Sequence, residues 1–372
     1  MLYELFRYLN EAHGFPYLVR YPSFRMVAAF LTAFLFCLAF GPAFLRALGR
    51  RKLGENVDKM GEARRKVVAA GKAGTPTMGG ILTFAAISVA ALLWTKLDTP
   101  LVWVGLVLFW GATAIGFLDD HVKQHHATKH GISGRLKLGL LSLLVVAAAL
   151  FLRQGIWSEG SLHGDDALEV LILPFAKDLV LPLGAVAFVA LAWGVICGSA
   201  NAVNLSDGMD GLAAGCLAIT GLALVVACNV VGTEDLAARF FVRHVPGCLE
   251  IAVVLAGLVG AALGFLWFNA APALVFMGDV GSLGFGTLLG FAAFASRMEV
   301  LLVVAGAVFV AEAGSVIVQV ASYKLFKKRV FRCTPIHHAF QLAGMPETRI
   351  VARFWVVAVL CAVLSLALFK VR

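Results

Sequence analysis

The sequence predicts an all-α fold, a polytopic membrane helical bundle of about ten transmembrane helices in a single domain over residues 1–372. Of the 372 residues, 60% are hydrophobic and only 14% are charged, a balance typical of integral membrane proteins. Apolar stretches of about 20 residues, long enough to cross roughly 30 Å of hydrocarbon as helix, recur along the chain. Because lipid offers backbone amides no partners, and the stretches lack the alternating pattern of a membrane barrel, we expect each to be an α-helix.

The apolar stretches give the expected order of spans. They lie near residues 24–46, 76–95, 100–118, 135–153, 180–200, 211–232, 248–268, 280–296, 299–323 and 351–370. Residues 1–23 lack the apolar core of a signal peptide, and we expect a short amphipathic helix there, lying at the membrane interface.

The distribution of Lys and Arg predicts the orientation of the bundle. Two strongly basic segments, 46–72 and 324–353, are expected to face the cytoplasm, whereas the acidic or mixed segments 154–179 and 233–247 are expected outside. With ten crossings, both termini then lie outside. The net charge of +9 mostly reflects this bias and gives no indication of nucleic-acid binding.

Polar clusters interrupt the apolar chain, and each falls at a span end on the predicted cytoplasmic side. They are Asp119-Asp120, then Asn204, Asp207 and Asp210, then the segment Asn269–Asp279, and His337-His338. The common side indicates a single site that faces the cytoplasm.

Asp119 and Asp120 close the third span. They could simply mark the membrane interface. However, the carboxyl end of a helix already carries partial negative charge, so it is a poor place for two anions. A bound cation would resolve this conflict, and Mg²⁺ prefers hard carboxylate oxygens.

Asn204, Asp207 and Asp210 follow the fifth span at intervals of three residues. On a helical turn this spacing puts the three side chains on one side. The alternative is that Asp207 or Asp210 caps the sixth span. Capping explains one aspartate rather than the set.

The segment from Asn269 to Asp279 joins an amide, an aromatic ring and a carboxylate in a turn that contains Pro and Gly. Its glycines allow the backbone to approach a phosphate or a metal, and Phe276 is suited to stack on a base. The alternative is a turn with a buried Phe.

Two further patterns suit anions. Lys72 and the stretch Thr75–Gly80 precede the second span, where amides at a helix N-terminus attract anions, although the ending of a P-loop is absent. His337 and His338 follow a basic run in the last cytoplasmic loop. They suit a phosphate or a sugar hydroxyl, or they are simply solvated.

Together, carboxylates for Mg²⁺, basic residues for a diphosphate and an aromatic ring for a base indicate phosphoryl chemistry on a nucleotide substrate at a membrane surface. A water-soluble nucleotide does not require ten spans, whereas a lipid co-substrate would.

These residues carry a resemblance that covers nearly the whole chain. The chain resembles the bacterial phospho-N-acetylmuramoyl-pentapeptide-transferases, a family of the polyprenyl-phosphate N-acetylhexosamine-1-phosphate transferase superfamily. The resemblance rests on five motifs in order, which are Thr75–Gly80, Asp119-Asp120 with Lys123, Asn204–Gly211, Asn269–Asp279 and Pro335–His338.

The resemblance implies transfer of phospho-MurNAc-pentapeptide from UDP-MurNAc-pentapeptide to undecaprenyl phosphate, which forms lipid I, releases UMP and uses Mg²⁺. It also implies a homodimer in the bacterial cytoplasmic (inner) membrane, with the active site facing the cytoplasm. Direct attack by the lipid phosphate and a covalent aspartyl intermediate are both compatible with it.

The resemblance further implies roles for single residues. The catalytic set is Asp119, Asp120, Asp279, Lys123 and His337. Mg²⁺ is expected on Asp279, with Asp119 and Asp120 as further candidate ligands. The substrate-binding set is Lys72, Thr75, Lys137, Asn204, Asp207, Gly208, Asp210, Asn269, Phe276 and His338.

The chain departs from the family pattern at two positions, where Ala339 and Gln341 replace a third histidine and a Glu. Whatever the third imidazole does is absent here or supplied elsewhere.

Two other functions are alternatives to this one. A sister transferase that moves GlcNAc-1-phosphate to the same lipid shares the aspartates. A transporter is the alternative of a different class, but its site is expected near the bilayer midplane rather than at span ends.

Overall fold

The computed structural model describes residues 1–13, 18–50, 75–125, 131–154, 170–172, 180–367 and 369. The described helices are α1 (Leu2–His13), η1 (Leu18–Arg20), α2 (Pro22–Arg50), α4 (Gly80–Trp94), α5 (Pro100–His125), α6 (Gly134–Gln154), α7 (Ala185–Ser206), α8 (Leu212–Gly232), α9 (Glu234–Arg239), α10 (Cys248–Asn269), α11 (Gly278–Ala295), α12 (Glu299–Ala305), α13 (Ala307–Phe326), α14 (Ile336–Leu342) and α15 (Glu347–Ala367). A small antiparallel hairpin, β1 (Val170–Ile172) with β2 (Val180–Pro182), lies between α6 and α7.

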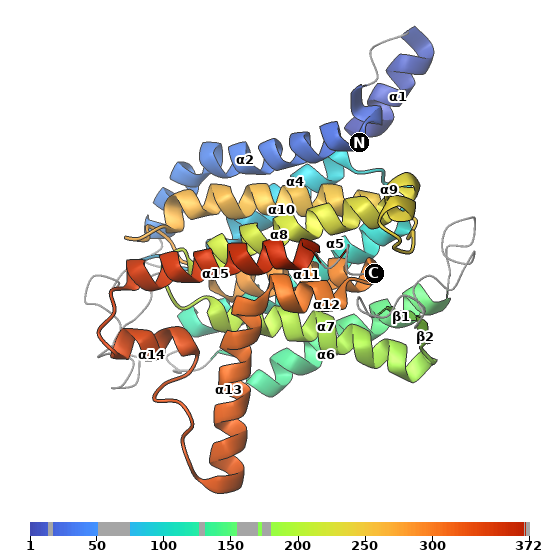
Figure 1. Cartoon of the computed structure of the whole chain (residues 1–372). Helices are drawn as coiled ribbons and strands as arrows, with labels where there is room; N and C mark the ends of the chain where they lie inside the picture. The colour runs from blue at the N-terminus through green and yellow to red at the C-terminus, as the bar shows by residue number, and fades with distance from the viewer. Residues whose placement is uncertain are drawn as a thin grey trace.

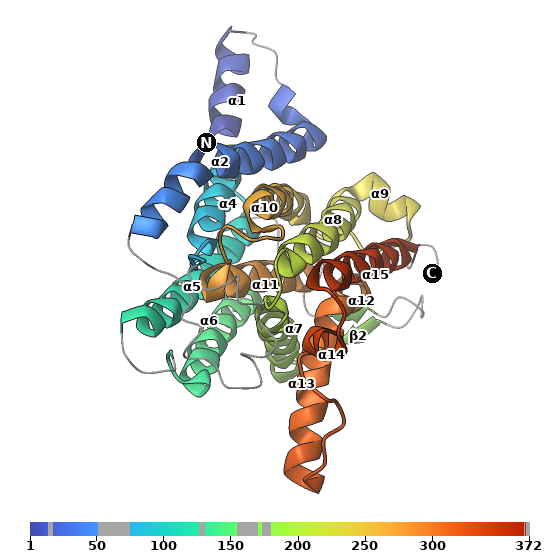
Figure 2. The same ribbon diagram turned by 90° about the vertical axis from the view of Figure 1, so that its left-hand side faces the viewer.

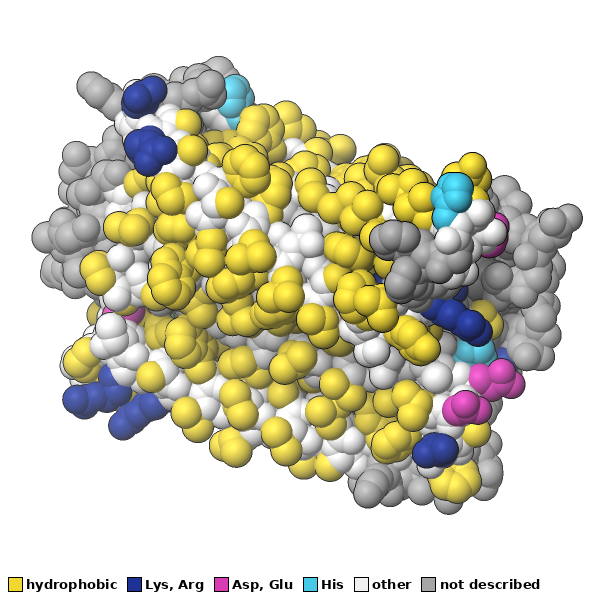
Figure 3. Space-filling model, turned by 90° about the horizontal axis from the view of Figure 1, so that it is seen from above, with side chains coloured by type: hydrophobic (Ala, Val, Ile, Leu, Met, Phe, Trp, Pro, Cys, Tyr) yellow, Lys and Arg dark blue, Asp and Glu magenta, His cyan; other side chains and the backbone are white. Residues whose placement is uncertain are grey.

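The helices confirm the predicted all-α membrane bundle. Within the described residues, nine helices are long and apolar enough to cross a membrane, and α4 is a shorter apolar helix. In the view of Figure 3, hydrophobic side chains cover the middle of the surface, whereas charged side chains and His gather toward its two ends. Such a belt is what a bilayer requires.

The first helix, α1, and the end of α15 lie toward the same end of the bundle, away from α14 (Figure 1). An even number of crossings requires this arrangement. The predicted N-terminal helix is also present, and the amino group of Met1 donates to the carbonyl of Leu92 at the end of α4 (2.8 Å). The side of the membrane on which the termini lie stays a prediction.

The ninth span differs from the prediction. Residues 299–323 were expected to form one helix, but the structure divides them at Gly306 into α12 and α13. After this break α13 leaves the bundle, as two perpendicular views show (Figures 1 and 2). Hydropathy alone could not detect the turn, since both halves are apolar. The outer part of α13 exposes Ile317 and Leu325, with 67% and 73% of their surfaces accessible, which suits contact with lipid.

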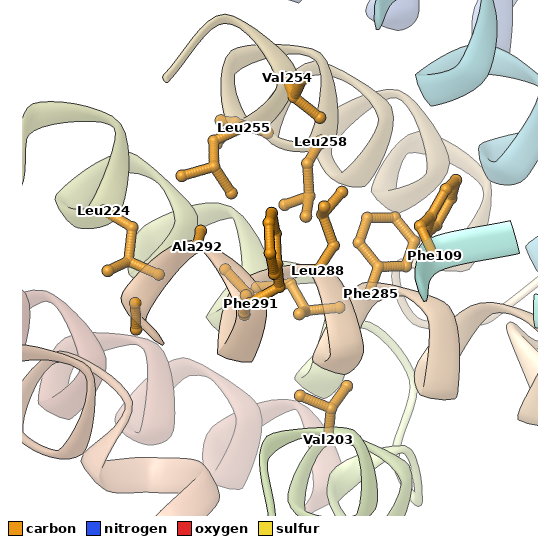
Figure 4. Close-up of a cluster of buried hydrophobic side chains, with 14 of the residues drawn as sticks. Phe109, Val203, Leu224, Val254, Leu255, Leu258, Phe285, Leu288, Phe291 and Ala292 are labelled. Atoms are coloured by element: carbon orange, nitrogen blue, oxygen red, sulfur yellow. The ribbon is translucent and has the colours of Figure 1, made fainter. Parts of the chain in front are cut away.

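Helix α11 occupies the centre of the bundle. It lies among α5, α7, α8 and α10 (Figure 2). Of its residues, 89% are buried inside the protein, more than in any other candidate span of the described chain. Figure 4 shows Phe285, Leu288 and Phe291 of α11 among side chains of these neighbours, including Phe109, Val203, Leu224, Val254, Leu255 and Leu258.

Small residues bring α11 close to α7. A Cβ atom added at Gly286 would lie 2.6 Å from the carbonyl oxygen of Ser199, and one added at Gly290 would lie 2.8 Å from the Cα of Ile196. Because apolar lipid gives helices no hydrophobic drive to associate, close packing through small residues spaced by four is a main source of their affinity. The distance between α11 and α7 is therefore set by direct packing of one helix against the backbone of the other.

A buried ion pair fastens the end of the bundle that carries the termini. The Arg25 guanidinium, fully buried on α2, donates to Glu250 on α10 through Nη2 (2.7 Å). Glu250 also accepts from the backbone amide of Lys96 (2.8 Å), and the ring of Tyr3 lies 5.1 Å from the guanidinium carbon. This group joins α1, α2, α10 and the turn after α4.

Replacing Glu250 by Ala should lower the free energy of unfolding by about 3 to 5 kcal/mol, because Arg25 is left as an unpaired buried charge. The unfolding midpoint of the purified protein in detergent measures this effect. The matched control is Glu4→Ala, which removes the exposed pair with Arg7 and should cost about 0 to 1 kcal/mol. Equal shifts in the two variants would contradict the expectation.

Candidate active site

Three aspartates from two helices meet at the end of the bundle that also carries α14. Asp119 and Asp120 lie in the last turns of α5, and Asp279 lies in the first turn of α11. One carboxylate oxygen from each lies within 4.8 Å of the others. Asp119 and Asp120 are almost fully buried, at 1% and 4% exposure. The structure thus brings the aspartate pair together with Asp279, the last residue of the segment Asn269–Asp279, as expected if these two polar clusters share one site.

Two lysines hold this acidic group together. Lys123 Nζ lies 2.7 Å from Asp119 and 2.9 Å from Asp279, and Lys137 Nζ lies 2.9 Å from Asp119 and also contacts Asp279. Three carboxylates and two ammonium groups leave one formal negative charge. Lys123 lies one turn after Asp119 on α5, whereas Lys137 comes from the first turn of α6.

Neutral donors fix the orientation of each carboxylate. The side-chain amide of Asn204 donates to Asp279 Oδ1 (2.7 Å) and to the hydroxyl of Ser282 (2.8 Å). The backbone amide of Ile132 donates to Asp119 Oδ1 (2.8 Å), and that of Val280 donates to an oxygen of Asp120 (3.2 Å). The carboxylates are thus held in place before any ligand arrives.

The donor set fits a hard divalent cation. Mg²⁺ takes oxygen ligands, usually from one or two carboxylates together with substrate phosphates. In the part of the chain that the structure describes, Asp119, Asp120 and Asp279 are the one group of three or more potential metal ligands. The side chain of Lys123 is 42% exposed, so it can move aside when another cation takes its place.

The turn after α7 corrects one prediction. The spacing of Asn204, Asp207 and Asp210 indicated a shared helical face, but α7 ends at Ser206, and the chain then turns. Asn204 therefore points to Asp279, whereas Asp210 accepts from the backbone amide of Ala273 (3.0 Å). The capping alternative does not hold either, because the N-cap of α8 is Gly211, without a side-chain hydrogen bond.

Asn269 lies at the end of α10, and only 2% of its surface is exposed. Its oxygen accepts from the amide of Gly211 (3.1 Å), and its nitrogen donates to the carbonyl of Val275 (2.8 Å). Both polar ends are thus used within the protein. Asn269 connects the turn after α7 with the loop before α11.

The motif Thr75–Gly80 pairs with the residues before α11 instead of offering its amides to an anion. Gly79 donates to the carbonyl of Phe276 (2.8 Å), and Gly80 donates to that of Met277 (2.9 Å). The amides of Gly79 and Gly80 are therefore already satisfied within the protein and are not available to an anion. The pairing fixes the backbone of Phe276, whose side chain is half-buried. Lys72 lies outside the described residues.

The two histidines lie on a helix, α14, where a solvated loop was one expectation. His337 is fully buried, with Nδ1 3.0 Å from Glu312 Oε2. His338 is half-buried, and its Nδ1 lies 3.3 Å from the amide oxygen of Gln341. Gln341 is one of the two departures from the family pattern, and it contacts the histidine that is more accessible.

Sequence reasoning missed three residues that the structure brings to this end of the bundle. Ser282 follows Asp279 by one turn on an apolar helix, a signal that could have identified it. Glu312 is an acid inside an apolar stretch, which is also a usable signal. Glu347, which accepts from the amide of Asp210 (2.8 Å), begins α15 and resembles an ordinary surface residue in the sequence.

These features define a class of protein. It is a multi-pass membrane protein with a site of paired carboxylates and lysines at one end of its bundle, and such a site is suited to phosphoryl transfer.

Comparisons with known proteins agree with this class. Residues 102–297 match the model of glycosyl transferase family 4, and residues 72–82 match phospho-N-acetylmuramoyl-pentapeptide-transferase signature 1. The phospho-N-acetylmuramoyl-pentapeptide-transferase of Desulfosudis oleivorans is 39% identical over 373 residues, which cover 100% of both chains. The chain belongs to the phospho-N-acetylmuramoyl-pentapeptide-transferase family and is a phospho-sugar transferase.

Replacing Asn269 by Ala should lower the free energy of unfolding by about 1 to 3 kcal/mol, because it leaves a buried amide and a buried carbonyl without partners. Thermal unfolding in detergent measures the effect. The control is Asn201→Ala, since Asn201 donates only to Cys197 one turn earlier in the same helix, and we expect a change of about 0.5 kcal/mol or less. A control as unstable as the Asn269 variant would disprove the connecting role.

Proposed function

We propose that this chain transfers phospho-MurNAc-pentapeptide from UDP-MurNAc-pentapeptide to undecaprenyl phosphate, releasing UMP and forming lipid I. The observation that carries the proposal is the group of Asp119, Asp120 and Asp279 with Lys123 and Lys137 at one end of a membrane bundle. Family membership over the full chain supports it. The match of residues 72–82 to the family signature favours the muramyl substrate over the sister reaction with GlcNAc.

The chemistry demands charge neutralisation more than a strong base. The second pKa of a phosphate ester is about 6, so the lipid phosphate is already largely dianionic near neutral pH. It must approach a diphosphate that is also anionic. Lys123 and Lys137 bridge the carboxylates and can turn toward phosphate oxygens. Asp279, with Asp119 and Asp120 beside it, would hold Mg²⁺, which supplies further positive charge at the diphosphate when bound.

The substrate-binding roles follow from position. Asp207 and Phe276 lie half-buried on the two loops that flank Asp279, and with Lys72, Thr75 and His338 we assign them to the walls of the nucleotide and sugar-phosphate pocket. Asp210 and Asn269 are more deeply buried and bind neighbouring backbone. We therefore assign them to the support of that pocket.

We further propose a homodimer in the bacterial cytoplasmic membrane, with the carboxylate site toward the cytoplasm. The orientation rests on the sequence, in which the segments 46–72 and 324–353 are rich in Lys and Arg, the residues that favour the cytoplasmic side.

Purified protein should release UMP from UDP-MurNAc-pentapeptide only when undecaprenyl phosphate and Mg²⁺ are both present, and chelation of the metal should abolish release. Asp279→Asn should lower kcat by about a hundredfold or more, because a transition-state charge contact is lost. UDP-GlcNAc in place of the muramyl substrate is the specificity control. UMP released from UDP-GlcNAc alone would assign the chain to the sister transferases, and release from neither substrate would reject the proposal.

Metal binding can be measured without turnover. Mn²⁺, followed by electron paramagnetic resonance, should bind and be displaced by Mg²⁺. Asn204→Ala removes the amide that orients Asp279, and it should weaken Mn²⁺ binding by about 10- to 100-fold, the usual effect of losing a supporting hydrogen bond. The control is Asp98→Asn, which alters an exposed carboxylate between α4 and α5. Equal affinities in wild type and the Asn204 variant would count against this metal site.

A further inference from the structure

A buried carboxylate outside every motif lies next to the candidate active site. Glu312 is in the second turn of α13, and it has no exposed surface. Its partner His337, on α14, is equally buried. A carboxylate and an imidazole enclosed together are costly to bury unless they bind each other, so the pair requires a reason.

The pair fixes the histidine at two points. Glu312 Oε2 lies 3.0 Å from His337 Nδ1 and 3.5 Å from the backbone nitrogen of His337, which donates to it. Nδ1 is thus the ring nitrogen beside the carboxylate, and Nε2 is the nitrogen on the other side of the ring. The position of the ring therefore depends on α13.

The far side of the ring lies against Gly208. A methyl group at Gly208 would clash with His337 Nε2, and the two adjacent ring carbons lie within 3.5 Å of the same position. Gly208 belongs to the turn of residues 207–211, which connects α7 and α8. Glu312, His337 and Gly208 thus form a continuous contact from α13 through α14 to this turn.

Two other groups hold the same turn. Glu347, on α15, accepts from the amide of Asp210, and Asn269, on α10, accepts from the amide of Gly211. Neither of these hydrogen bonds involves the first half of the turn, where Gly208 lies. His337 therefore supports the half that joins directly to α7 and to Asn204, the residue that orients Asp279.

We propose that Glu312 is a positioning residue, which holds His337 against Gly208 and so fixes the turn of residues 207–211 as a wall of the nucleotide site. The inference rests on the proposed function, because it takes this wall to contact the UDP-sugar. It revises the role of His337, which the resemblance placed in the catalytic set. Fully buried, His337 acts on the substrate through the turn, while the more accessible His338 is the histidine that faces it.

The decisive variant is Glu312→Gln, which preserves shape and removes the charge. We expect KM for UDP-MurNAc-pentapeptide to rise about tenfold, while kcat and KM for undecaprenyl phosphate change by about threefold or less. The turn is expected to bind the substrate equally well in the ground state and in the transition state. Losing such binding raises KM and leaves kcat nearly unchanged.

The matched control is Glu299→Gln. Glu299 is also a buried carboxylate with one cationic partner, Arg297, at 3.1 Å, but the pair follows the far end of α11, away from Asp279. This variant should lower the unfolding temperature as Glu312→Gln does, with KM for the nucleotide substrate unchanged within about twofold. If both variants lose stability and neither changes KM, Glu312 is merely structural and the proposal is overturned.

Two further variants guard against a Glu312→Gln protein that does not fold. Gly208→Ala keeps Glu312 and His337 intact but pushes the ring and the turn apart, so it should raise the same KM. In the double variant of Glu312→Gln with His337→Gln, KM should rise no more than in the worse single variant, because the two residues act as one unit. The proposal would be rejected if the increases in KM of the two single variants multiplied in the double variant. A normal KM in Gly208→Ala would also reject it.

The experiments distinguish failure of the proposed function from failure of the proposed role of Glu312. A wild-type protein without transferase activity contradicts the proposed function, whereas an active wild type with a normal KM in Glu312→Gln contradicts only the role of Glu312.

Discussion

Repulsion among three carboxylates is the constraint on which this end of the molecule depends. Two unit charges 4 Å apart repel by about 4 kcal/mol at an effective dielectric constant of 20. Asp119, Asp120 and Asp279 lie at about this separation and are largely buried. The arrangement is tenable because Lys123 and Lys137 lie between them and backbone amides donate to them. The same balance would suit the proposed reaction, since a site with one excess negative charge would attract a divalent cation.

Holding charges in such a balance requires a rigid frame, and the central helix provides it. Helix α11 is enclosed by four other helices and approaches α7 through Gly286 and Gly290. Its first turn, which carries Asp279, is also closely packed, since a Cβ atom added at Gly281 would lie 2.9 Å from the Cα of Gly80. The loops around it are bound to one another. Asn269 joins the turn after α7 to the loop before α11, and Gly79 and Gly80 pair with the same loop.

Buried ion pairs fasten the bundle away from the site as well. Arg25 with Glu250 and Arg297 with Glu299 lie at helix ends remote from Asp279, where each joins segments distant in sequence or closes a turn. In a medium that gives helices no hydrophobic reason to associate, satisfied polar contacts and close packing carry the specificity of assembly. Glu312 with His337 is of the same kind, but its position beside Gly208 connects it to the candidate site.

The sequence by itself determined the membrane bundle, the order of its spans and the carboxylates of the site. Hydropathy reports transfer into lipid residue by residue, and an acid such as Asp120 or Asp279 at the end of an apolar span is costly enough to stand out. Only the tertiary structure decided where the chain turns and what each polar group faces. The break at Gly306, the end of α7 before Asp207 and the enclosure of His337 by Glu312 all depend on contacts between distant segments. Local spacing carries no information about such contacts, because a side chain's partner is set by the packing of other helices around it.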